Sequence, residues 1–135
     1  MAKYAQGLLD TSVLIDLESI DPELLPNEAS ISAISMAELS AGPHATSDVD
    51  ERARRQARLQ FIEAYMSPIP FDADCARAYG LVFAAVSAVG RKPRGARAVD
   101  LMIAATSVSL GLPLFTRNAV DFAGLEDLTA IVSLP

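Results

Sequence analysis

The feature of this sequence that most constrains its fold is the alternation of short apolar segments with longer segments of helical periodicity. The apolar segments of strand length lie at residues 7–10, 29–34, 68–71, 112–116 and 130–134. Between them, apolar side chains recur at helical spacing, most clearly over residues 50–66, 73–89 and 98–110. Strands that alternate with helices predict an α/β fold, in which helices cover both faces of a parallel sheet of about five strands.

Length and composition narrow the class of protein further. The chain has 135 residues, and we expect a single domain over residues 1–135. Its one cysteine, Cys75, excludes an intrachain disulfide, and its one histidine, His44, excludes a site built from several imidazoles. The longest apolar run, residues 81–89, is too short to span a bilayer, and acidic residues interrupt the N-terminal segment that a signal peptide would need. We therefore expect a cytoplasmic protein with no membrane association.

The basic residues are concentrated although the chain is acidic overall. The formal net charge of −6 argues against a protein that coats nucleic acid non-specifically. One basic window covers residues 52–58, where the simplest interpretation is the solvated face of a helix. The other covers residues 90–97, whose two glycines and one proline predict a loop. The candidates in this loop for contacts with RNA phosphates are Arg91, Lys92, Arg94 and Arg97.

Acidic side chains are predicted to gather at the carboxyl edge of the sheet, where parallel α/β folds bind ligands. Asp10 ends the first strand, and Asp121 follows the strand at residues 112–116. Glu38 and Asp100 fall in the first turns of two predicted helices. Carboxylates so close raise each other's pKa unless something neutralises them. Because no histidine or thiolate accompanies them, they favour a hard cation, Mg²⁺ or Mn²⁺.

Each of these acids also has a purely structural interpretation. Asp10 can cap the first helix, and Asp121 can brace the short turn in which it lies. Ser35 and Glu38 have the spacing of a capping box. Asp100 is favoured near a helix start by the helix dipole alone. The metal interpretation depends on all four acids sharing one edge of the sheet.

Four motifs, in order, resemble those of the PIN-domain family. They are residues 8–16 (LLDTSVLID), 35–39 (SMAEL), 98–105 (AVDLMIAA) and 116–122 (TRNAVDF). Each motif alone is weak, but their order and spacing span almost the whole chain. The size and single-domain organisation further resemble the VapC toxins of bacterial toxin–antitoxin pairs.

This resemblance implies a PIN-type three-layer α/β/α fold with strand order 3-2-1-4-5. It implies an endoribonuclease that depends on Mg²⁺, or on Mn²⁺ as a substitute, and cleaves structured RNA such as tRNA or rRNA. It also implies a cognate VapB-type antitoxin, a homodimer and a higher toxin–antitoxin complex. By position, Asp10, Glu38 and Asp100 match the family's metal-binding acids, and Ser12 and Thr116 match accessory hydroxyl positions.

The fourth acidic position departs from the family pattern. Many relatives have an acid two residues after the threonine, where this chain has Asn118, so Asp121 is the nearest substitute. Either Asp121 or Asn118 can complete the site, since an amide carbonyl also binds a cation or orients water. The candidate catalytic residues are thus Asp10, Glu38, Asp100 and Asp121. The candidate metal ligands are Asp10, Asp100 and Asp121, with Ser12, Thr116 and Asn118 as accessory residues.

Two other functions compete with the ribonuclease. A catalytically silent PIN-domain binding module is favoured only by Asn118, and it would bind RNA with weak metal affinity. A phosphoacceptor receiver domain also has an acidic Mg²⁺ pocket, but it needs a lysine after its last strand, and the chain has only Lys3 and Lys92.

An antitoxin has a physical rationale in this sequence. An acidic pocket without metal is self-repelling, so it would accept an inserted arginine or lysine. An apolar groove between helices would hold an amphipathic helix of the partner. The candidate apolar positions for this groove are Leu14, Leu17, Leu59 and Ile62.

Overall fold

The computed structural model describes residues 4–92 and 95–135, so the predicted phosphate contact at Arg94 lies outside the described residues. The strands are β1 (Gln6–Leu9), β2 (Glu28–Ser32), β3 (Pro68–Ile69), β4 (Leu114–Thr116) and β5 (Ile131–Ser133). The helices are α1 (Thr11–Ile15), α2 (Ala33–Ala41), α3 (Val49–Tyr65), α4 (Ala73–Ala88) and α5 (Ala96–Leu110). Short 3₁₀ turns are η1 (Leu17–Ser19), η2 (Pro22–Leu24), η3 (Gly42–Ala45) and η4 (Ala119–Phe122).

The five strands form one parallel sheet in the order β3-β2-β1-β4-β5. The predicted fold class and strand order are therefore confirmed. The central strand β1 pairs with β2 on one side and with β4 on the other, where Leu9 lies opposite Phe115. As a result, the carboxyl ends of β1 and β4 are adjacent, and the residues that follow them meet at one edge.

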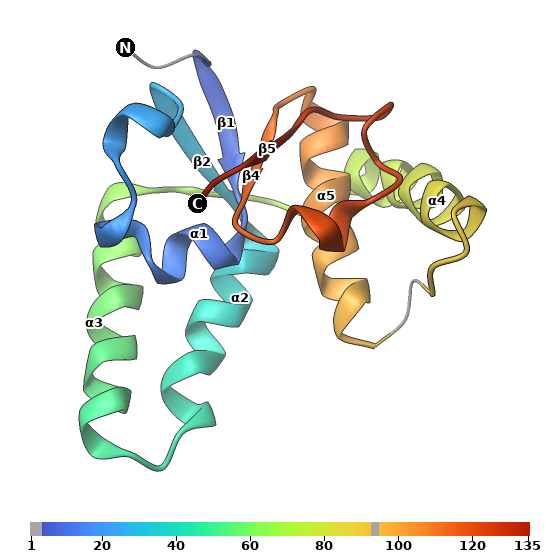
Figure 1. Cartoon of the computed structure of the whole chain (residues 1–135). Helices are drawn as coiled ribbons and strands as arrows, with labels where there is room; N and C mark the ends of the chain where they lie inside the picture. Colours follow the sequence, from blue (N-terminus) through green and yellow to red (C-terminus); the bar gives the residue numbers. More distant parts are fainter. Residues whose placement is uncertain (1–3, 93–94) are drawn as a thin grey trace.

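Helices cover both faces of this sheet, as Figure 1 shows. Because successive side chains of a strand point to opposite faces, the fully buried Leu8 and Leu9 belong to two separate cores. Leu8 packs with α4 and α5, and Leu9 packs with α1, α2 and α3. The site at the carboxyl edge is thus supported by a packed core on each side. Among the described residues, no helix is long and apolar enough to cross a membrane.

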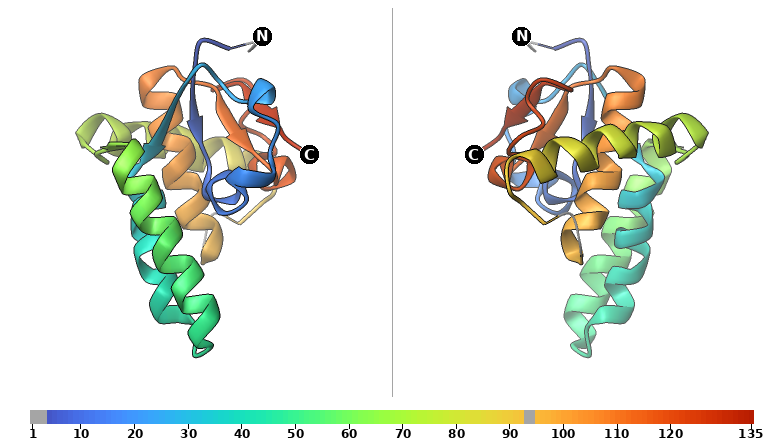
Figure 2. Two further views of the ribbon diagram at one scale, coloured as in Figure 1. Left: turned by 90° about the vertical axis from the view of Figure 1, so that its left-hand side faces the viewer. Right: turned by 90° about the vertical axis from the view of Figure 1, so that its right-hand side faces the viewer.

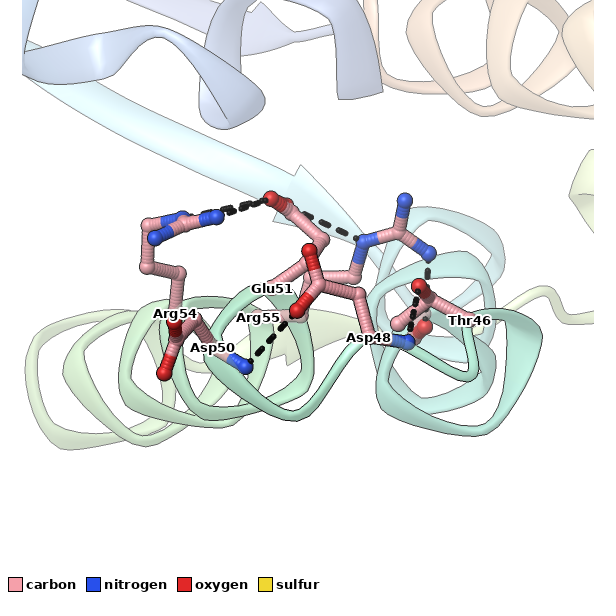
Figure 3. A network of polar contacts seen from close by, with 7 residues as sticks. Thr46, Asp48, Asp50, Glu51, Arg54 and Arg55 are labelled. Carbon is pink, nitrogen blue, oxygen red and sulfur yellow. Dashed lines mark hydrogen bonds and ion pairs between the residues drawn. The ribbon is translucent and has the colours of Figure 1, made fainter.

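Helices α2 and α3 run side by side and extend beyond the sheet (Figure 2). At the start of α3, Glu51 forms ion pairs with Arg54 at 3.1 Å and Arg55 at 3.3 Å (Figure 3). Arg55 also donates from Nη1 to the carbonyl oxygen of Gly42 at 2.9 Å, which joins α3 to η3. The basic window at residues 52–58 is therefore a helix surface, as the sequence predicts. Arg55 also links α3 to the η3 turn that follows α2.

Two helix starts differ from the sequence prediction. Helix α2 begins at Ala33 because the hydroxyl of Ser32 accepts a hydrogen bond from the backbone N–H of Ser35 at 3.0 Å. The capping box predicted for Ser35 and Glu38 is therefore wrong, and Glu38 lies in the second turn. Helix α5 begins at Ala96, which places Asp100 beyond its first turn as well. Neither acid therefore lies in the first turn of its helix, and the helix dipole does not account for its position.

A glycine is required where the backbone of β1 meets an aromatic ring. A Cβ at Gly7 would lie 2.3 Å from Cε1 of Phe115, a fully buried side chain. We expect Gly7→Ala to lower the free energy of unfolding by about 1–3 kcal/mol, because the ring has to shift within a packed core. Urea denaturation measures this, with Gly80→Ala as the control. Gly80 lies within α4, and a Cβ there would meet no atom within 4 Å, so alanine should stabilise by about 0.5–1 kcal/mol.

Candidate active site

Asp10 is the buried centre of the carboxyl edge, with 4% of its surface exposed. It follows β1 and caps α1, where its Oδ1 accepts from the backbone N–H of Thr11 at 2.8 Å. Its Oδ2 accepts from the hydroxyls of Ser12 at 3.0 Å and Thr116 at 2.8 Å. The structural interpretation of Asp10 as a helix cap is thus correct, and the same side chain also lies at the predicted site. Three hydrogen bonds fix the orientation of its carboxylate.

The two accessory hydroxyls connect β1 with β4. Ser12 Oγ accepts from the backbone N–H of Arg117 at 3.1 Å, and Thr116 Oγ1 accepts from that of Asn118 at 3.0 Å. Ser12 and Thr116 therefore satisfy the backbone after β4 while they donate to Asp10. The Asn118 side chain itself is exposed at this edge.

Glu38 reaches the edge from α2 through Thr11, a residue not predicted from the sequence to be functional. Thr11 Oγ1 donates to Glu38 Oε1 at 2.6 Å and lies 2.9 Å from the hydroxyl of Ser35. The Glu38 side chain is exposed, so this contact is what orients its carboxylate. The only sequence signal for Thr11 is its position directly after Asp10.

Asp100 lies in the field of the other three acids. The pKa of its carboxyl is raised from 3.8 to about 6, first by partial burial and then by the charges of Asp10, Asp121 and Glu38, in that order. The cation of Arg97 opposes them. Among the described residues, none donates a hydrogen bond to the Asp100 carboxylate. The folded protein therefore holds four acids close enough to repel one another, and this repulsion contributes to the raised pKa of Asp100.

This repulsion predicts how stability without metal depends on pH. The folded-state pKa of Asp100 lies above its unfolded value, so protonation of this carboxyl favours the folded state. The resulting stability is fully present below about pH 4 and is lost as pH rises through about 6. Asp100→Asn should therefore be more stable than the parent at pH 7.5 and equally stable near pH 4. The full shift would correspond to about 3 kcal/mol, but solvent screens this half-buried group, so we expect about 1–2 kcal/mol.

Urea denaturation in a chelator at both pH values measures this difference in stability. A difference between Asp100→Asn and the parent that does not change with pH would contradict the assignment of the repulsion to Asp100.

Two basic residues of the window at 90–97 contact the turn that carries Asp121. Arg91 lies after α4, but Arg97 lies in the first turn of α5, so the predicted loop does not extend to residue 97. Arg97 Nη1 donates to the carbonyl oxygen of Asp121 at 3.2 Å, and Arg91 donates to that of Val120. Lys92 is exposed. Arg91 and Arg97 thus lie beside the turn that carries Asp121.

The donor atoms at this edge suit a hard cation. They are carboxylate, hydroxyl and amide oxygens, without histidine or thiolate. Within the described residues, no three acidic, histidine or cysteine side chains are arranged to hold one ion as they stand. The carboxylates of Asp10 and Glu38 are instead turned toward the hydroxyls that bind them. An ion held by one or two carboxylates and several waters fits these residues, and this is the usual coordination of Mg²⁺.

Two of the four residues proposed for the antitoxin groove are buried in the core. Leu14 and Ile62 are each only 1% exposed and belong to the core around Leu9. Leu17 and Leu59 are partly buried against the same core. Helical periodicity marks a buried face, but it does not separate core from groove, so Leu14 and Ile62 are wrong candidates.

Comparison with known proteins places this chain and its fold in a family. The family model of the PIN domain matches residues 7–127. Ribonuclease VapC5 of Mycobacterium tuberculosis is 36% identical over 130 residues, which cover 94% of this chain and 93% of the relative. The crystal structure of VapBC-5, a member of the VapBC family of toxin–antitoxin systems from the same organism, matches with a TM-score of 0.81 and 35% identity. The match covers 94% of this chain and 95% of that one. DNA-bound VapBC from Salmonella typhimurium matches with a TM-score of 0.68 and 26% identity, covering 92% and 95%.

The chain belongs to the PIN-domain family. The PIN-domain resemblance of the four motifs is therefore confirmed. The chain is similar to VapC ribonucleases along almost their whole length. PIN-domain ribonucleases generally depend on divalent metal ions. This membership leaves no place for the receiver-domain alternative.

Proposed function

We propose that this chain is the toxin of a toxin–antitoxin pair, a metal-dependent endoribonuclease that a VapB-type antitoxin neutralises. The endoribonuclease class and the antitoxin partner agree with the relatives named ribonuclease VapC and with the VapBC complexes. The observation that carries the chemistry is the field of Asp10, Asp121 and Glu38 at Asp100. Four acids converge there, and a divalent cation is the ligand that would relieve their repulsion.

We propose Asp10, Asp100 and Asp121 as the residues that hold the ion, with Glu38 nearby. Mg²⁺ fits this oxygen donor set, and Mn²⁺ is the substitute. When bound, such an ion supplies Lewis acidity and neutralises charge on phosphate oxygens. Asp121 is preferred over Asn118 as the fourth residue because its charge already acts on Asp100.

The remaining residues position the acids and the substrate. Ser12 and Thr116 hold the Asp10 carboxylate in its orientation through their hydroxyls. Thr11 does the same for Glu38. Arg91, Lys92 and Arg97 would bind RNA phosphates next to the acids, and Arg94, outside the described residues, is proposed for the same role.

The substrate and assembly follow the same proposal. We propose structured RNA, tRNA or rRNA, as the substrate and a homodimer within a larger toxin–antitoxin complex as the assembly. The acidic edge would accept a basic side chain of the antitoxin in place of metal, because either cation relieves the same repulsion.

A catalytically silent binding module is the second candidate. It is favoured by the neutral Asn118 and because, in the described part of the chain, no three acidic, histidine or cysteine side chains are arranged to hold one ion. Such a module would bind RNA without hydrolysing it.

Thermal unfolding with and without Mg²⁺ or Mn²⁺, run beside a cleavage assay on total tRNA and rRNA, separates these functions. A ribonuclease should gain several degrees in Tm at millimolar metal and cleave RNA only when metal is added. RNA binding without cleavage or metal-induced stabilisation would establish the silent module. The absence of both cleavage and RNA binding would overturn the proposed substrate.

A further inference from the structure

A hollow of about 350 Å³ lies beside the acidic site at the carboxyl edge. It is lined by Ser12, Ile15, Asp16, Arg117, Asn118 and Pro135. Ser12 belongs to both the hollow and the site, because its hydroxyl donates to Asp10. A molecule in the hollow would therefore be in contact with a direct partner of the central carboxylate.

Arg117 is held in this hollow by contacts in the plane of its guanidinium. Its Nε donates to the carbonyl oxygen of Pro135 at 3.0 Å, and its Nη1 forms an ion pair with Asp16 at 2.5 Å. Hydrogen bonds of a guanidinium lie in its plane, so these two acceptors fix the plane and leave its faces for stacking. The side chain remains 32% exposed. A fixed planar cation of this kind is a surface on which nucleobases stack.

Two other side chains give the hollow features that suit a base. Ile15, at the end of α1, is 45% exposed although it is a large apolar residue, so it offers an apolar contact to a ring. Asn118 is exposed and carries both a donor and an acceptor, which match the hydrogen-bonding edge of a base. Stacking, apolar contact and an amide are together what single-stranded RNA recognition uses.

We propose that this hollow binds one unstacked nucleobase of the RNA substrate, next to the phosphate that the acidic site receives. The inference rests on the proposed ribonuclease function and adds a subsite to it. The base stacks on Arg117 and contacts Ile15. The backbone N–H of Arg117 donates to Ser12 Oγ, which donates to Asp10, so the stacking residue is two hydrogen bonds from the carboxylate. Base binding in the hollow would thereby set the register of the RNA on the acids.

Binding of fluorescent hexaadenylate to the full chain tests this subsite, with Asp100→Asn as the background so that the RNA stays intact. The comparison probe is the same hexamer with one abasic nucleotide, moved through each position. One position should lose about fivefold or more in affinity when its base is absent. Arg117→Lys, which keeps the charge but not the plane, should abolish this preference, and Ile15→Ala should reduce it. Leu110→Ala is the matched control, since Leu110 is 48% exposed and outside the hollow.

Each outcome of this experiment bears on the proposal. Equal affinity for the intact and every abasic hexamer would overturn the subsite while leaving the ribonuclease proposal standing. A base preference that survives in both Arg117→Lys and Ile15→Ala, with both variants folded by thermal unfolding, would also overturn it. Failure to bind any hexamer would overturn the subsite, while the assays on tRNA and rRNA decide the RNA substrate separately.

Discussion

Asp100→Asn is expected to lower metal-dependent RNA cleavage by about a hundredfold or more while the protein stays folded. The substitution removes a charged oxygen ligand from the proposed ion, and losses of this size follow when a group acting directly on the reacting charge is removed. The metal-induced rise in Tm should disappear in the same variant. Initial cleavage rates at several Mn²⁺ concentrations, with thermal unfolding in parallel, measure both effects.

Asp10→Asn should lose cleavage to the same extent but should differ from Asp100→Asn in stability. The Asp10 carboxylate accepts three hydrogen bonds in a buried position, whereas the Asp100 carboxylate is destabilised by its burial and its neighbours. Asp10→Asn should therefore lower the free energy of unfolding, and Asp100→Asn should raise it at pH 7.5. Glu28→Gln makes the same chemical change in an exposed residue that starts β2, at the opposite edge of the sheet, and should leave cleavage unchanged. Full activity in both aspartate variants would refute the assigned site.

Thr116→Val is expected to destabilise the protein by about 2–3 kcal/mol. Thr116 is fully buried and donates to Asp10 Oδ2 at 2.8 Å, and its oxygen accepts from the backbone N–H of Asn118. Valine has nearly the same shape but cannot donate, so a buried carboxylate loses a charge-assisted hydrogen bond. Urea denaturation at pH 7.5 measures the loss.

Thr116→Ser separates the hydroxyl from the packing of the methyl group. Serine keeps the hydroxyl and should retain most of the cleavage that valine loses. If Thr116→Val were as stable and as active as the parent, the hydroxyl would have no role in orienting Asp10.

Much of the fold could be predicted because local patterns decide it. Apolar runs separated by helical segments indicate parallel strands with crossover helices, and the observed sheet has this topology. The motifs that resemble PIN domains supply the strand order and the grouping of Asp10, Ser12 and Thr116. Asp10 directly precedes α1, Ser12 lies in the first turn of α1, and Thr116 ends β4. Predicting where these elements begin and end therefore locates the three residues to within one or two positions.

Helix starts and groove residues are harder to predict because they depend on competing partners. Ser32 and Ser35 are both residues of a type that caps helices, and in the structure Ser32 is the one that takes the cap, directly after β2 ends. Leu14 and Ile62 have the same helical spacing as residues of a groove, but α1 and α3 pack them against Leu9. Periodicity identifies an apolar face and says nothing about what covers it.

The sequence by itself determined that four acids and two hydroxyls follow parallel strands or lie near helix starts. Only the tertiary structure decided what these groups do to one another. Thr11 orients Glu38 across 27 positions of sequence, and Arg117 joins Asp16 to Pro135 beside the site. The pKa of Asp100 rises because burial acts on it together with three charges that come from distant parts of the sequence. Hydrogen bonds and charge interactions depend on separations of a few ångströms, which are set by packing between segments far apart in the chain.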